Sequence, residues 1–455
     1  MIARVKAIWN RLKSLRKRAE TVGKLDLGLT VCDGEVSHRR LVIPQGRRTE
    51  HIAILGKTGT GKSSLLRSLC GQDIAGDRGF VFFDLHGDAT PFLLRRVALE
   101  ERRRGCDLSG KLIVIDPADT EWSVGLNVLE RAEKTSVFVQ IAEFAELLKH
   151  RWHLESLGPR TEELLRSALY VLAENDLTLL ELAPLLINPA FRASCLRNLQ
   201  NPDIRQYFEA RYDKLSEGMR TMVREPILNK TSTFTTDPQF RHILGQQKST
   251  FSLQDAMRRG CWVVLNLHKG RLGEEAVTLG SLFLSIIKNA LFSRQTRELF
   301  TLYCDEIQNL LGYDSGLDTI LSESRKFGIS VISANQFLDQ YPPRMRAAIL
   351  AVGTHIFFQL TSSDAQQVAT GLDGGRPLAE LLKNLPRGHV VVKSGSDHWA
   401  EVRTWRVDDP RVSYSSLYDR CRERWARRRS QVEEEIAERH ARLIPEADAV
   451  LRGWE

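Results

Sequence analysis

The sequence lacks long apolar runs and has few cysteines. No stretch reaches the roughly 18 apolar residues that a membrane-spanning helix needs, and the nearest, Ala276 to Ile287, predicts a buried core helix. Lys6, Arg11 and Lys13 interrupt the apolar positions near the start, so no secretory signal is predicted. The seven cysteines are scattered without C-x-x-C or zinc-ligand spacing. We therefore expect reduced thiols in a cytoplasmic protein.

The overall composition is that of an ordinary globular protein. A chain of 455 residues, 42% hydrophobic and 27% charged, can bury a large core and form about two or three domains. The formal net charge of +8 permits a polyanionic partner such as nucleic acid, but does not establish one.

A basic amphipathic pattern opens the chain. Apolar residues recur at helical spacing over residues 1–18, with lysines and arginines around them. Such a helix can lie on an anionic membrane surface at its periphery, dock on a partner, or pack on its own domain. From Leu25 to Gly46 short apolar runs alternate with turns, so residues 1–47 are expected to hold this helix and a small β element.

The most informative stretch runs from His51 to Leu69. A short apolar strand is followed by a glycine-rich turn and the start of a helix, and the turn fits G-x-x-x-x-G-K-[ST]. This pattern predicts a P-loop, whose backbone N–H groups surround phosphates. Lys62 is expected to reach the β- and γ-phosphates of ATP, and Ser63 to bind Mg²⁺. The predicted nucleotide-binding residues are Gly56, Lys57, Thr58, Gly59, Thr60, Gly61, Lys62, Ser63 and Ser64.

Strand-like and helix-like segments alternate on both sides of a long helical stretch. Apolar runs such as Gly79 to Leu85 and Cys261 to Leu267 follow helix-like segments, which predicts a mostly parallel α/β sheet. Between them strand signals vanish and the period becomes helical. We therefore expect a sheet domain over 48–133 and 245–410, an inserted all-α domain over 134–244, and a C-terminal helix over 411–455.

Two further strand ends carry polar residues suited to nucleotide hydrolysis. The apolar run Leu299 to Asp305 is followed at once by Glu306, which predicts Mg²⁺ binding by Asp305 through water and water activation by Glu306. A later strand ends before Gln336, whose amide can contact the γ-phosphate or the attacking water. The alternatives are a solvated acidic turn and a merely polar strand end.

Taken together in order, the motifs resemble those of the HerA–FtsK superfamily, and within it the type IV secretion coupling proteins of the TraD/TraG kind. The resemblance spans about residues 48–395 and includes GKTGTGKSS, VFFDLHGD, IDPAD, VVLNLHKGRLGEEA, YCDEIQNLL, SESRKFGISVISANQ and AVGTHIFFQLTSSDAQ. It implies a RecA-like P-loop ATPase domain with an all-α insertion, assembled as a hexameric ring around DNA. Unlike membrane-anchored coupling proteins, the sequence begins without transmembrane helices.

The resemblance also implies an arginine that completes the ATP site of the neighbouring subunit. The matching position is Arg325, which could instead be a surface arginine, and Arg344 or Arg346 could take the role. Lys269 and Arg271, which follow a strand, are candidate contacts to DNA without sequence preference.

The motifs favour one of three functions. The favoured function is an ATP-hydrolysing ring motor that translocates DNA in conjugative or type IV secretion transfer, with secretion-channel or relaxase partners. The second is a HerA-type DNA-processing translocase or helicase. The third is a nucleotide-gated scaffold that moves nothing, against which the presence of Glu306 argues, since a scaffold needs no water-activating carboxylate.

Overall fold

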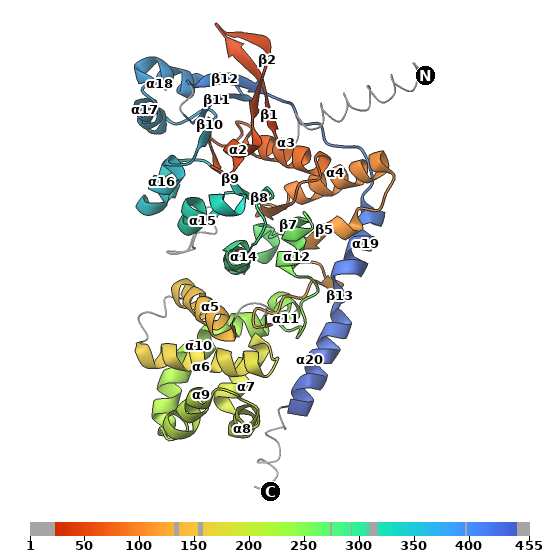
Figure 1. The fold of residues 1–455 in the computed structure, drawn as a ribbon, viewed down its shortest axis with the longest axis vertical. Helices are drawn as coiled ribbons and strands as arrows, with labels where there is room; N and C mark the ends of the chain where they lie inside the picture. The colour runs from red at the N-terminus through yellow and green to blue at the C-terminus, as the bar shows by residue number, and fades with distance from the viewer. Residues whose placement is uncertain are drawn as a thin grey trace.

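A computed structural model gives the fold, which is organised around one eleven-stranded sheet (Figure 1). The structure describes residues 23–131, 136–152, 158–273, 275–292, 294–306, 308, 317–395 and 398–443. The amphipathic helix expected over residues 1–18 thus lies outside the described residues.

Seven neighbouring strands of the sheet run parallel. They are short, apolar and almost fully buried, as expected for strands that helices cover on both faces. In order across the sheet they are β10 (Thr354–Phe357), β3 (Ile52–Leu55), β9 (Ile329–Asn335), β8 (Phe300–Asp305), β4 (Phe80–Asp84), β7 (Trp262–Asn266) and β5 (Leu112–Ile115). Because parallel strands end at the same edge, the residues that follow β3, β4, β8 and β9 come together there.

Four antiparallel strands extend the sheet beyond β10. They are β11 (His389–Ser394), β12 (Ala400–Thr404), β1 (Leu25–Cys32) and β2 (Glu35–Ile43). The β element expected between Leu25 and Gly46 is thus present, but its strands β1 and β2 are the last two strands on one side of the main sheet. This happens because β12 pairs with β1, with Thr404 opposite Gly28.

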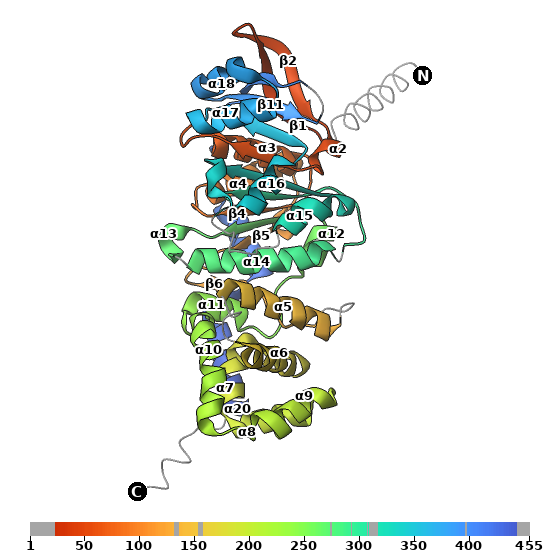
Figure 2. The ribbon, with the colours of Figure 1, turned by 90° about the vertical axis from the view of Figure 1, so that its left-hand side faces the viewer.

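Helices cover both faces of the parallel strands (Figure 2). Alternate side chains of β4 serve the two cores: Phe82 shares one with α3 (Lys62–Ala75) and α4 (Ala89–Arg104), and Phe83 shares the other with α14 (Glu275–Phe292). The expected buried core helix after Ala276 is α14. Other helices beside the sheet are α2 (Gln45–Arg48), α12 (Leu253–Arg258), α13 (Lys269–Leu272), α15 (Leu317–Glu323), α16 (Pro343–Leu350), α17 (Ser362–Gly371) and α18 (Gly375–Asn384).

An all-α insertion lies below the sheet in Figure 1. Its helices are α5 (Val137–Trp152), α6 (Pro159–Glu174), α7 (Leu182–Ile187), α8 (Pro189–Arg197), α9 (Pro202–Gln206), α10 (Glu217–Thr236) and α11 (Pro238–Leu244). In the described part of the chain, no single helix is both long and apolar enough to cross a membrane. One sharply bent pair, Leu179–Ile187 with Pro189–Arg197, meets that test by length and composition alone.

The C-terminal segment is divided, so the expectation of one helix over 411–455 is wrong. The chain forms α19 (Ser415–Trp425) and α20 (Arg429–Leu443), with a break at the extended residue Ala426. The break arises because Arg427–Arg428 form the short strand β13, which pairs with β6 (Trp122–Ser123). The two helices run along one side of the molecule from the sheet to the insertion (Figure 1).

Candidate nucleotide site

The turn between β3 and α3 has the backbone of a P-loop. Gly59 and Gly61 have φ angles of +80° and +123°, which residues with a side chain rarely adopt. A Cβ atom at Gly56 would lie 2.4 Å from the Cβ of Phe358, so a larger residue does not fit without displacing the chain. The glycines thus leave a cradle of backbone N–H groups at the start of α3, which fits a phosphate.

Lys62 lies inside this turn. Its Nζ atom donates hydrogen bonds to the carbonyl oxygens of Gly56 at 2.6 Å and Lys57 at 2.9 Å. Burial lowers the pKa of Lys62 from its ordinary value, although the charges of Asp305 and Glu306 act to raise it. The turn therefore holds a buried cation that faces two carboxylates, an arrangement suited to a triphosphate with its metal ion.

The two residues expected to bind Mg²⁺ lie in contact. Asp305 ends β8, and its carboxylate accepts a hydrogen bond from the hydroxyl of Ser63. Burial raises the pKa of Asp305, against the effect of this hydrogen bond. Hydroxyl and carboxylate oxygens are ligands that Mg²⁺ takes together with phosphate and water. In the described residues no group of three or more His, Cys, Asp or Glu side chains could hold a metal ion.

Glu306 and Gln336 are joined to the P-loop by a chain of hydrogen bonds. Gln336 Nε2 donates to Glu306 Oε1 at 2.7 Å, and Gln336 Oε1 accepts from the Thr58 hydroxyl at 3.0 Å. Glu306 has a φ of +55°, a conformation uncommon for a residue with a side chain and often found at functional sites. The structure thus brings Thr58, Lys62, Ser63, Asp305, Glu306 and Gln336 together at the carboxyl edge of the sheet.

His86 is a member of this group that the sequence reasoning passed over. Its Nε2 atom lies 3.2 Å from Glu306 Oε2, and this hydrogen bond raises the pKa of His86 from its ordinary value, against the effect of burial. The contact exists because β4 lies beside β8 in the sheet. The available signal was the DLHGD stretch directly after an apolar strand, but the order of the strands is not readable from the sequence.

The loop that carries His86 is held by Asp84. The buried carboxylate of Asp84 accepts hydrogen bonds from the N–H of Gly87 at 2.9 Å and of Thr90 at 2.7 Å, and from the Thr90 hydroxyl at 2.7 Å. The acid at the end of β4 therefore shapes its own loop.

Arg325 lies at the opposite edge of the sheet. It precedes β9, whose seven residues span about 20 Å before Gln336. Its Nη2 atom lies 3.1 Å from Glu50 Oε1, and its side chain is 66% exposed. Arg344 and Arg346 lie on α16, where Arg346 pairs with Asp339 at 2.9 Å. The fold therefore separates Arg325 from the nucleotide site of its own chain.

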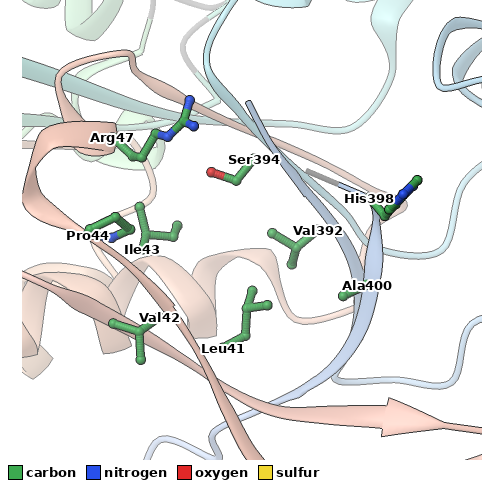
Figure 3. Close-up of a pocket in the computed structure, with 9 residues that line it drawn as sticks. All are labelled: Leu41, Val42, Ile43, Pro44, Arg47, Val392, Ser394, His398 and Ala400. Carbon is green, nitrogen blue, oxygen red and sulfur yellow. The ribbon is translucent and has the colours of Figure 1, made fainter. Parts of the chain in front are cut away.

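A cavity of about 130 Å³ lies away from the P-loop, where β2 approaches the β11–β12 hairpin (Figure 3). It is lined by Leu41, Val42, Ile43, Pro44, Arg47, Val392, Ser394, His398 and Ala400. None of the predicted site residues borders it.

Comparisons with known proteins identify the family of this chain. The family model described as the type IV secretion-system coupling protein DNA-binding domain matches residues 35–406. Comparison with curated proteins gives no match.

Solved structures show the same fold at low sequence identity. The bacterial conjugative coupling protein TrwBdeltaN70 is 16% identical with a TM-score of 0.56, over 85% of this chain and 91% of that one. The plasmid coupling protein TrwB in complex with ADP and Mg²⁺ gives 16% and 0.55, over 86% and 97%. VirB4 of Thermoanaerobacter pseudethanolicus gives 16% and 0.54, over 84% and 96%.

Proposed function

Because this chain belongs to the type IV secretion-system coupling protein DNA-binding domain family, we propose that it is a Mg²⁺-dependent ATPase that moves DNA during conjugative transfer. The observation that carries the proposal is the hydrogen-bonded line from Thr58 through Gln336 to Glu306, beside Lys62. Further support comes from the similar protein TrwB, whose structure contains ADP and Mg²⁺.

In this proposal each residue has one task. The P-loop N–H groups and Lys62 bind the phosphates, replacing the carbonyl contacts that Lys62 makes within the turn. Ser63 and Asp305 hold Mg²⁺, which neutralises charge on the phosphates. Glu306 orients the attacking water and takes its proton. Gln336, which touches both Thr58 and Glu306, senses whether a γ-phosphate is present.

Arg325 is proposed to act in the site of a neighbouring subunit. Its exposure and its place at the far edge of the sheet support a role outside its own chain. An arginine that stabilises charge on the transferred phosphoryl group typically contributes about 10³ to 10⁵ in rate. We therefore propose a ring-shaped homo-oligomer, a hexamer, in which each site is completed by the next subunit.

DNA is proposed to contact the basic turn α13 without sequence preference. Lys269 and Arg271 are exposed on α13, directly after β7, at the same edge of the sheet as the nucleotide site. Residues 1–18 would add a peripheral contact to an anionic membrane, and relaxase or secretion-channel proteins would be the partners.

The test of this function is ATP turnover with and without DNA of mixed sequence. We expect the chain to hydrolyse ATP in the presence of Mg²⁺, and DNA to raise the rate. Hydrolysis without any response to DNA would contradict the proposal that the chain is a DNA motor. ATP binding without hydrolysis would indicate a nucleotide-gated scaffold.

Subunit mixing tests the arginine. Rings of Arg325→Ala chains and rings of Lys62→Ala chains should both be inactive, and mixed rings should regain hydrolysis wherever an intact P-loop meets an intact arginine. If hydrolysis does not recover although the Arg325→Ala ring still binds ATP, Arg325 does not act in the site of the neighbouring subunit. Arg344→Ala and Arg346→Ala, mixed in the same way, would then identify the arginine.

A further inference from the structure

The basic turn α13 is attached directly to the loop that carries His86. The N–H of Lys269 donates to the carbonyl of Leu85 at 2.9 Å, and the N–H of Leu267 donates to the carbonyl of Asp84 at 2.9 Å. These two bonds join the segment after β7 to the segment after β4.

Side-chain packing strengthens this attachment. The His268 ring lies so close to Gly87 that a Cβ atom there would be 2.1 Å from His268 Cδ2. Gly87 has a φ of +76°. Both this backbone conformation and the nearby His268 ring therefore favour glycine at position 87. With Asp84 holding the same loop from the other side, the loop has little room to move independently of α13.

His86 stands between the two residues of this loop that contact the α13 segment, and its side chain is turned toward the site. Its Nε2 atom donates to Glu306 Oε2, while Gln336 Nε2 donates to Glu306 Oε1. Both carboxylate oxygens of the proposed water-activating acid are therefore engaged within the chain. Each oxygen keeps a second lone pair that can accept from water, but the hydrogen bond from His86 fixes the direction in which the carboxylate points.

We propose that His86 is a positioning residue that restrains Glu306 until DNA binds at α13. Phosphates drawn to Lys269 and Arg271 shift the α13 segment, and the Leu85–Gly87 loop moves with it and draws His86 away from Glu306. DNA must bind the shifted arrangement more tightly, since a ligand moves an equilibrium only by its difference in affinity. This inference rests on the proposed function, and it assigns the element through which DNA regulates ATP hydrolysis.

The first test compares ATP turnover with and without DNA in the wild type and three variants. His86→Ala should raise turnover without DNA and reduce the stimulation ratio by about fivefold or more, within the usual range of coupling between sites. His86→Gln keeps an amide donor near Glu306 and should retain most of the stimulation. His38→Ala is the matched control, because His38 is exposed on β2.

The second test needs no nucleotide. Hydrogen–deuterium exchange over 84–90 and 267–272 should change together when DNA of mixed sequence is added. In a Lys269→Ala, Arg271→Ala double variant neither segment should respond. Adding these two substitutions to His86→Ala should cause little further loss of the stimulation by DNA, because the relay is already broken.

The outcomes separate this inference from the function beneath it. A wild type without DNA-stimulated hydrolysis would overturn both. A stimulated wild type whose His86→Ala variant keeps the same ratio, or loses turnover with and without DNA alike, would overturn the relay alone. Exchange that changes near α13 but not over 84–90 would do the same.

Discussion

Two carboxylates in different parts of the chain differ in how they are held. Glu306, at the nucleotide site, is 18% exposed, has a positive φ, and has the half-exposed His86 among its partners. Glu181, where α20 meets the helical insertion, has a fully buried side chain. Its Oε1 accepts from Arg439 Nε at 2.9 Å and from His440 Nε2 at 2.8 Å.

The remaining oxygen of Glu181 is also saturated. Glu181 Oε2 accepts from the N–H and the hydroxyl of Thr178, both at 2.8 Å, in a capping box. Arg439 in turn donates to the carbonyl of Gly245 at 2.9 Å. A carboxylate with buried partners on both oxygens stabilises structure, whereas one with solvent access and a strained backbone can change partners during a reaction.

The cluster around Glu181 belongs to a strap, our name for α19 and α20 together, which connects the sheet to the helical insertion. In α19, Cys421 is buried in a core shared with the sheet, and Trp425 Nε1 donates to the carbonyl of Ser109 at 2.9 Å. In α20, Ile436 packs against Leu180 of the insertion. The C-terminal helices therefore fasten the insertion to the sheet by contacts that have no part in the chemistry.

The largest effect is expected at the nucleotide site, where substitutions should lower ATP turnover and leave stability unchanged. Glu306→Gln should lower ATP turnover by about 10² to 10⁴, the usual contribution of a general base, while leaving the melting temperature unchanged. Lys62→Ala should abolish turnover, and unlike Glu306→Gln it should weaken ATP binding because a phosphate contact is lost. Turnover, nucleotide binding and thermal melting measure the three quantities. Near-native turnover in Glu306→Gln would mean that another group activates the water.

In the strap, by contrast, a substitution should lower stability and leave ATP affinity unchanged. Arg439→Ala leaves the buried Glu181 without its main charge partner, which should cost about 3–5 kcal/mol in the free energy of unfolding. Arg442→Ala, on the exposed face of the same helix, is the matched control and should change it little. Chemical denaturation measures both, and ATP affinity should stay unchanged in each. Equal losses in the two variants would contradict a special role for the buried pair.

Salt should act on only one of the two regions. DNA binding through Lys269 and Arg271 should weaken as salt rises, and removing each contact should lower the slope of log affinity against log salt by about one. The buried contacts of Glu181 are shielded from screening, so the melting temperature should respond little. Fluorescence anisotropy with labelled DNA measures the slope. An unchanged slope in both Lys269→Ala and Arg271→Ala would mean that DNA binds another part of the chain.

The parts of the fold that could be predicted from the sequence are those encoded locally. The P-loop is one continuous motif, and apolar runs ending in Asp305 or before Gln336 predict strands whose ends meet once the sheet is parallel. The fold class and the family follow from these motifs. The structure places the predicted P-loop, acid and glutamine side chains at one edge, while their roles in catalysis stay predictions.

What could not be predicted depends on contacts between distant segments. The pairing of β12 with β1, the break at Ala426 and the contact of His86 with Glu306 each require the order of strands in space. Arg439 and His440 occur in a stretch of mixed charge that reads as a solvated helix. Only the position of Glu181, more than 250 residues earlier, makes them part of a buried cluster.

The smallest effect concerns acid, and it should appear in the strap. Burial acts to raise the pKa of Glu181, but the hydrogen bond from His440 and the charge of Arg439 outweigh it and hold the pKa below the ordinary value of 4.5. A depressed pKa means that the ionised group stabilises the folded chain above about pH 4.5, and that this contribution is lost as the pH falls through the folded-state pKa. Glu181→Gln removes the titrating group, so the difference in unfolding free energy between wild type and variant should be constant from pH 7 to about 5 and shrink below that. Taking the difference cancels the titrating groups that do not contact Glu181, and making the comparison in a His440→Gln background removes the imidazole that does. A difference that stays constant into acid would mean that Glu181 stabilises the strap by shape and hydrogen bonding alone, without its charge.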